Sequence, residues 1–179
     1  MTRRNQVLDA AIHVLGTSGL RGLTHRAVDT EARLPLGSTA NLFGRRTELL
    51  EAIVERLQER DHELWASAQG RPEPMDMAAL AQELAGFVRH AGSPELVAMF
   101  RARYYLQLSL PDPVLAGNRA LTAEVASWMS LVGADPGRVE VVMATLDGVL
   151  LRAVTFGAEL VPDEQELAAA LLLLMAPPA

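Results

Sequence analysis

Residues 20–50 read LRGLTHRAVDTEARLPLGSTANLFGRRTELL, and this stretch decides the fold of the surrounding chain. Its pattern predicts two short helices on either side of a tight turn, followed by the start of a longer helix. Thr24 is a suitable N-cap for the first short helix, and Pro35 suits the first position of the second. Val28 and Phe43 are expected to face a small core. This is the layout of a helix-turn-helix, a motif that reads DNA.

The second predicted helix carries small or polar side chains without charge, and arginines surround it. Such a surface suits base edges at its centre and phosphates at its rim. An asparagine can pair with adenine, and an exposed leucine can contact a thymine methyl group. The residues expected to contact bases are Leu36, Gly37, Ser38, Thr39 and Asn41. Those expected to contact phosphates are Thr24, Arg26, Arg45 and Arg46.

Residues 7–50 resemble the DNA-binding domain of the TetR family of bacterial transcriptional regulators. In that family an apolar helix precedes a G-x-x-x-x-T motif, a second helix, and a recognition helix of the form GT-L-Y-Y-x-F that ends near a basic residue. The matching positions here are Val7-Leu8 to Val14-Leu15, Gly19, Thr24, Arg26-Ala27-Val28, Gly37-Ser38-Thr39, Phe43, Arg46 and Leu49-Leu50. The resemblance implies a regulator of transcription, and it favours repression over activation.

Three departures from the family pattern fall inside the motif. Arg33 stands where the family usually has a glycine in the turn, and Pro35 stands where a capping serine is common. Ala40 and Asn41 occupy positions where the family often has aromatic residues that touch DNA. If the turn requires a positive φ, an arginine there costs about 1 kcal/mol relative to glycine.

The charge of the chain is divided along its length. The formal net charge is −6, yet residues 1–46 contain seven arginines and three acidic residues, a charge of +4. The remaining residues carry nine basic and nineteen acidic side chains, a charge of −10. DNA would attract one end of such a chain and repel the other over a Debye length of about 8–10 Å. We therefore expect a DNA-binding domain at residues 1–46 and a helical ligand-binding and dimerisation domain at residues 47–179.

The composition favours an all-α fold and excludes several classes of protein. Half of the residues are apolar but only 4% are aromatic, and leucine and alanine dominate. Cysteine is absent, so neither a disulfide framework nor a thiolate zinc site is available. No apolar run reaches the roughly 20 residues that span a bilayer, which favours a soluble, cytoplasmic protein that does not insert into a membrane.

Helix start signals divide the rest of the chain. An N-cap residue or a polar residue followed by proline opens most of the later segments. In all, the sequence predicts about nine helices and no strand. The helices expected outside the motif cover residues 2–17, 44–69, 76–92, 93–108, 112–133, 135–157 and the segment from 162 onward.

The last two predicted helices, at about 136–157 and 163–175, are apolar on more than one side. A homodimer in which each subunit contributes both helices to a four-helix contact would cover this surface. The resemblance implies the same dimer, which would place two DNA-binding domains about 34–36 Å apart on a pseudo-palindromic operator. The alternative is that both helices simply fill the core of a monomer.

The family's second domain typically binds a small effector between its middle helices. Several large residues and methionines gather in the corresponding helices here, together with a few polar groups. The residues predicted to bind an effector are Trp65, Phe87, His90, Phe100, Arg103, Tyr104, Gln107 and Trp128. Effector binding is then expected to shift the helix after Phe43 and release the operator. The alternative for each of these residues is an ordinary core position.

No catalytic motif is present. The sequence has no G-x-S-x-G, no H-E-x-x-H and no glycine-rich phosphate loop, and its four histidines are scattered. We therefore expect neither an enzyme nor a metal or cofactor site. A second class of function stays open, namely a helix-turn-helix regulator with a filled second domain that responds to a partner protein.

Overall fold

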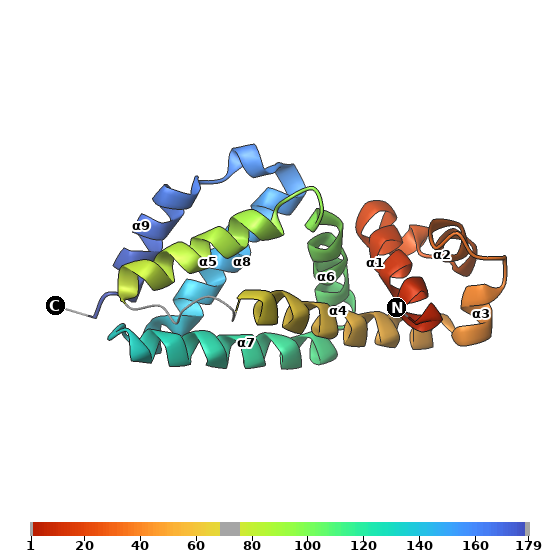
Figure 1. Ribbon diagram of the computed structural model, residues 1–179, viewed down its shortest axis with the longest axis horizontal. Helices are drawn as coiled ribbons and strands as arrows, with labels where there is room; N and C mark the ends of the chain where they lie inside the picture. The colour runs from red at the N-terminus through yellow and green to blue at the C-terminus, as the bar shows by residue number, and fades with distance from the viewer. Residues whose placement is uncertain (1, 69–75, 178–179) are drawn as a thin grey trace. The chain divides into compact units, whose positions relative to one another are not determined.

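The computed structural model describes residues 2–68 and 76–177, and within these ranges the protein contains nine α-helices and no strand (Figure 1). The all-α prediction is therefore confirmed. The helices are α1 (Arg3–Gly22), α2 (His25–Glu31), α3 (Ser38–Leu42), α4 (Arg46–Ala68), α5 (Met77–Ala91), α6 (Val97–Ser109), α7 (Pro111–Leu131), α8 (Val139–Phe156) and α9 (Glu164–Met175). Two short 3-10 segments, η1 (Pro136–Arg138) and η2 (Ala158–Leu160), flank α8.

The chain forms two compact units. The first unit comprises Met1–Ala68 and Val97–Val114, and the second comprises Gln69–Leu96 and Leu115–Ala179. The first unit is larger than the segment 1–46 that we expected to bind DNA, because it also contains α4 and α6. The expected functional boundary at residue 46 does not coincide with a boundary between the two units, and it stays a prediction.

The first unit is built around α1. This helix packs against α2, α4 and α6, and its inward side chains, including Val7, Leu8 and Leu15, are fully buried. Gly16 allows the close approach of α6, because a Cβ at this position would overlap the backbone oxygen of Ala98. The helix extends to Gly22, beyond the predicted end at residue 17, with a kink where Gly19 adopts a φ of 66°.

Side-chain N-caps mark several of the helix starts. The side chains of Thr24, Asp76 and Asp163 accept hydrogen bonds from the backbone three residues later, and Asp163 forms a capping box with Glu166. Two predicted starts are wrong by three or four residues. Helix α3 begins at Ser38 instead of Pro35, and the helix expected from residue 93 begins at Val97, because turns occupy the intervening residues.

In the second unit, α5 packs against α8 and α9 (Figure 1). Their shared core contains leucines such as Leu84, Leu146 and Leu171. The outer faces of α8 and α9 expose further apolar side chains, which are Val141, Leu151, Phe156, Leu172 and Leu173. Among the helices described, none is long and apolar enough to cross a membrane.

Candidate nucleic-acid interface

The turn between α2 and α3 is tight and depends on two residues with positive φ. The N–H of Leu34 donates to the carbonyl of Asp29 at 2.9 Å, which closes the end of α2. Arg33 adopts a φ of 54°, and Gly37 adopts a φ of 93° just before α3. The backbone therefore reverses within six residues and presents α3 next to α2.

The exposed surface at α3 is formed by Leu36, which precedes the helix, and by the last three residues of the helix. Leu36 is 69% exposed, Leu42 is 43% exposed, and Ala40 and Asn41 are also exposed. Leu36 and Asn41 were predicted to contact bases, whereas Ala40 and Leu42 were not. The exposure of α3 residues cannot be read from the sequence, because a five-residue segment is too short to show a helical period.

The structure corrects the expectation for Ser38 and Thr39. Thr39 is fully buried, and its hydroxyl donates to Asp29 Oδ1 at 2.6 Å. Ser38 is also buried, and its hydroxyl donates to the carbonyl of Pro35 at 2.6 Å. Both hydroxyl groups therefore hold the turn and the start of α3, and neither side chain is free to meet a base.

Asp29 is the central polar residue beneath α3, and the sequence analysis did not single it out. Its carboxylate accepts hydrogen bonds from the N–H groups of Gly37 and Thr39, both at 2.7 Å, and from the Thr39 hydroxyl. Burial opposes ionisation of this carboxyl, but the hydrogen bonds from Thr39 and Gly37 outweigh it and hold the pKa of Asp29 below its ordinary value. In the sequence, only its position next to Val28, which was expected to face the core, could have indicated that Asp29 is buried.

The arginines near α3 fall into two groups. Arg26 and Arg45 are exposed, in keeping with contacts to phosphates. Arg46, in contrast, donates to the backbone carbonyls of Leu20 and Leu23 at the end of α1. Its guanidinium thus joins the start of α4 to α1, and because Arg46 is exposed as well, its contact with a phosphate stays a prediction. Thr24 is exposed and caps α2, with Ala27 N–H donating to its hydroxyl at 3.2 Å.

Two further arginines at the start of α1 reach the same region. The guanidinium of Arg3 donates to the Ser38 hydroxyl at 3.2 Å. Arg4 lies over the ring of Phe43, 5.7 Å from its centroid, and pairs with Glu55 of α4 at 3.3 Å. The start of α1 is thus attached to α3 and to α4 at once.

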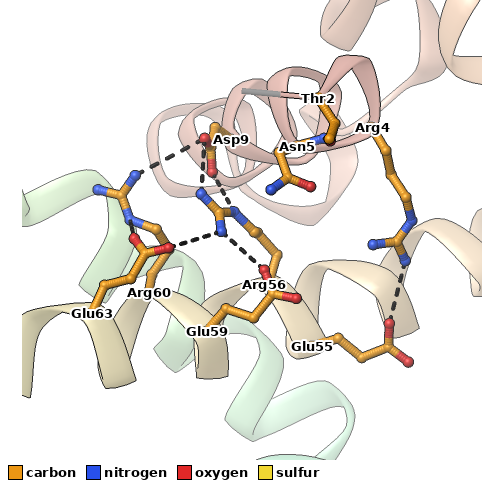
Figure 2. A network of polar contacts seen from close by, with 9 residues as sticks. All are labelled: Thr2, Arg4, Asn5, Asp9, Glu55, Arg56, Glu59, Arg60 and Glu63. Carbon is orange, nitrogen blue, oxygen red and sulfur yellow. Dashed lines mark hydrogen bonds and ion pairs between the residues drawn. The ribbon is translucent and has the colours of Figure 1, made fainter. Parts of the chain in front are cut away.

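A network of charged side chains joins α1 to α4 farther along both helices (Figure 2). Arg56 is buried, and its guanidinium binds both carboxylate oxygens of Asp9, at 2.8 and 3.2 Å. It also donates to Glu59 at 2.9 Å and to Glu63 at 3.3 Å. The hydrogen bonds to these carboxylates raise the pKa of Arg56 above its ordinary value. The links from α4 to α1 are those of Arg56 and Arg60 to Asp9, whereas Glu59 and Glu63 pair with arginines of their own helix.

The residues predicted to bind an effector are divided between the two units. Phe100, Arg103, Tyr104 and Gln107 lie on α6 in the first unit, whereas Phe87, His90 and Trp128 belong to the second. The side chain of Trp65 lies outside the described residues. Phe100 is buried and His90 is exposed. Arg103 forms an ion pair with Asp61 of α4 and lies over the ring of Phe100, so its charge is already matched within the protein.

A hollow in the second unit lies between α5, α8 and the segment after η2. Its walls include Val88, Gly92, Ala153 and Leu167. None of the residues predicted to bind an effector lines it. The predicted effector site therefore stays a prediction.

The comparisons with known proteins agree on the fold. No protein-family model and no curated protein matches the sequence. Among solved structures, a member of the TetR family from Streptomyces coelicolor is 28% identical, covers 99% of this chain and 100% of its own, and has a TM-score of 0.75. The multidrug binding protein EbrR in complex with malachite green is 25% identical over 99% of this chain and 100% of its own, with a TM-score of 0.75. EbrR in complex with proflavin is 30% identical over 97% of this chain and 99% of its own, with a TM-score of 0.56.

Proposed function

Because the chain belongs to the TetR family of bacterial transcriptional regulators, we propose that it is a cytoplasmic, dimeric repressor. In this proposal it binds a pseudo-palindromic operator and leaves it when a small, largely apolar effector binds the helices beyond the DNA-binding domain. Binding to DNA is the central part, and dimerisation and effector release are built on it.

The observation that carries the proposal is the uncharged, exposed side of α3 near exposed arginines. Leu36, Ala40 and Asn41 offer a methyl-rich and amide surface of the kind that meets base edges in the major groove. Arg26 on α2 and Arg45 just before α4 are exposed and offer positive charge. A surface with these groups fits base contacts at the centre and phosphate contacts at the rim.

Dimerisation is supported by the exposed apolar side chains of α8 and α9. Leu151, Leu172 and Leu173 lie on helices whose other faces already fill the core of the second unit. Small residues on the same helices, Gly148 and Ala169, are exposed as well and would let a second copy approach closely. A contact between the same two helices of two subunits would remove this apolar surface from water.

Release by a small effector is supported by the likeness to EbrR, which has been solved in complexes with malachite green, ethidium and proflavin. An effector lowers operator affinity only if it binds the DNA-free conformation more tightly than the DNA-bound one. We propose that the effector of this protein acts in this way.

The DNA-binding proposal is tested with an operator selected from random duplexes and with two variants. Asn41→Ala should lower operator affinity by a factor that corresponds to about 1–3 kcal/mol and should leave binding to unrelated DNA unchanged. Arg45→Ala should weaken binding to all sequences and lower the salt slope by about 1. Fluorescence anisotropy at several salt concentrations measures both quantities.

Arg119→Ala is the matched control, because Arg119 is an exposed arginine on α7 of the second unit. It should change neither affinity nor salt slope. If the wild-type protein selects no sequence and binds no duplex at low salt, the proposed function is wrong. If both Asn41→Ala and Arg45→Ala lower affinity uniformly, the assignment of Asn41 to a base is wrong.

A further inference from the structure

We propose that Asp29 is a positioning residue for DNA recognition, because its carboxylate caps the recognition helix α3 from the neighbouring helix α2. The inference rests on the proposed function and adds a residue to it. Asp29 touches no DNA in this account. It acts by setting where the exposed side of α3 lies relative to α2.

Helix α3 depends on an outside cap because it is short. It has five residues, and isolated helices of this length are not stable in water. Its own N-cap residue is Gly37, which has no side chain to accept a hydrogen bond from the first turn. The N–H groups at the start of α3 therefore need an acceptor from another part of the protein.

Asp29 supplies that acceptor with both of its oxygens. Oδ2 accepts from Gly37 N–H and Oδ1 accepts from Thr39 N–H, each at 2.7 Å, and Oδ1 also accepts from the Thr39 hydroxyl at 2.6 Å. These are short, charge-assisted hydrogen bonds, which are about twice as strong as those between neutral groups. One carboxylate thus ties two backbone positions and one side chain of α3 to α2.

The other hydrogen bonds at the start of α3 are local or come from α1: Ser38 donates to the carbonyl of Pro35 from both its N–H and its hydroxyl. The helix packs mainly on α2, and the Arg3 guanidinium reaches Ser38 from α1. Because Asp29 and Thr39 are both buried, water cannot replace their hydrogen bond when one partner is changed. A change at Asp29 should therefore alter the pose of α3 before it unfolds the rest of the unit.

The charge of Asp29 has the wrong sign for attracting DNA. A carboxylate beneath the helix that approaches phosphates opposes binding by simple electrostatics. Removing it would raise DNA affinity if charge were its only effect. If Asp29 positions α3, removing its charge should lower operator affinity instead. The two explanations therefore predict opposite changes in operator affinity, which makes the inference testable.

The test compares Asp29→Asn with Glu31→Gln, a control that removes the same charge from an exposed side chain on the same helix. Asp29→Asn should lower the ratio of operator affinity to unrelated-DNA affinity by at least about tenfold, since the amide oxygen can accept from only one of the two N–H groups and the NH2 group faces the other as a second donor. Glu31→Gln should leave this ratio unchanged and should not weaken binding to unrelated DNA. Anisotropy titrations at one temperature, well below the unfolding midpoint of each variant, measure the ratio.

Thr39→Val is a second variant in case Asp29→Asn does not fold. It removes only the hydroxyl donor and keeps the backbone N–H at position 39. It should lower the ratio of operator affinity to unrelated-DNA affinity by a smaller factor than Asp29→Asn does. If both folded variants retain the wild-type ratio, or if Asp29→Asn raises operator affinity, the inference is wrong.

Hydrogen exchange separates this inference from the proposed function. The amide protons of Gly37 and Thr39 should be protected in the wild-type protein and lose protection in Asp29→Asn, with no DNA present. If the wild-type protein selects no DNA but this loss is seen, the proposed function fails and the capping role stands. If the amide protons of Gly37 and Thr39 exchange equally fast in both proteins, the capping role is wrong, whatever the result of the DNA-binding measurements.

Discussion

Arg33 occupies a backbone conformation that suits glycine. Its φ of 54° is left-handed, and its side chain is exposed. In the described structure, no contact requires an arginine at this position. The TetR family usually has glycine at this turn position, and the expectation was strain at Arg33 if the turn requires a positive φ; the structure shows that positive φ. The strain of a single residue in such a conformation can be relieved by a substitution.

Arg33→Gly should therefore stabilise the protein by about 1 kcal/mol, because glycine adopts this conformation without a Cβ clash. Urea unfolding of the wild type and the variant measures the difference. Arg26→Gly is the control, since Arg26 lies within α2, where glycine should destabilise the helix by up to about 1 kcal/mol. A loss of stability in Arg33→Gly would show that the arginine side chain contributes more than its backbone costs.

Residues of the same chemical type have different roles in the candidate interface. Thr24 and Thr39 are both threonines in the motif, yet Thr24 is exposed and Thr39 is buried against Asp29. Arg45 and Arg46 are neighbours, yet only Arg46 binds the carbonyls of α1. Residue type alone predicted DNA contacts for all four; burial separated the two threonines, and hydrogen bonds distinguished the two arginines, which are both exposed.

At the scale of the elements, the start of a helix was predictable where a residue caps its own helix. Thr24, Asp76 and Asp163 bind the backbone three residues later, so the signal is local. The start of α3 was not predictable, because its cap comes from Asp29, eight to ten residues earlier. Pro35 is compatible with a helix start but lies in the turn instead.

The pairing of α1 with α4 depends on Arg56, whose side chain is 8% exposed and binds three carboxylates (Figure 2). Arg56→Met should keep the aliphatic packing but leave these carboxylates without their shared cation. We expect it to destabilise the protein by about 2 kcal/mol, below the full cost of breaking a buried pair because the carboxylates are partly exposed.

Glu55→Gln serves as the control for this prediction, because Glu55 pairs with Arg4 at the same helix pair but in solvent. Its effect should stay below about 1 kcal/mol. Thermal and urea unfolding of both variants provide the comparison. Similar losses in the two variants would mean that burial of Arg56 adds nothing to its ion pairs.

At the scale of the whole molecule, the proposed dimer requires the exposed apolar surface of α8 and α9. Leu173→Arg should place a charge in that contact and convert the dimer to a monomer at micromolar concentration. It should also weaken operator binding, because two linked DNA-binding domains bind a pseudo-palindrome more tightly than one. Sedimentation velocity gives the oligomeric state, and anisotropy gives the affinity.

Leu108→Arg is the matched control on α6 of the first unit. Leu108 is 87% exposed and Leu173 is 76% exposed, so neither substitution disturbs a core. Leu108→Arg should leave the oligomeric state unchanged. A dimer that persists in Leu173→Arg would place the contact between subunits elsewhere, and a wild-type monomer would contradict the proposed dimer altogether.

The sequence by itself determined the all-α class, the helix-turn-helix and most helix starts. These features depend on neighbouring residues, whose spacing and caps are visible along the chain. Only the tertiary structure decided that Thr39 and Arg46 hold the protein together, that Asp29 caps α3, and that α6 belongs to the first unit. Those features join residues that belong to different helices or their caps, from eight residues apart upward, and no local pattern records which side chains the folded backbone brings within hydrogen-bond distance.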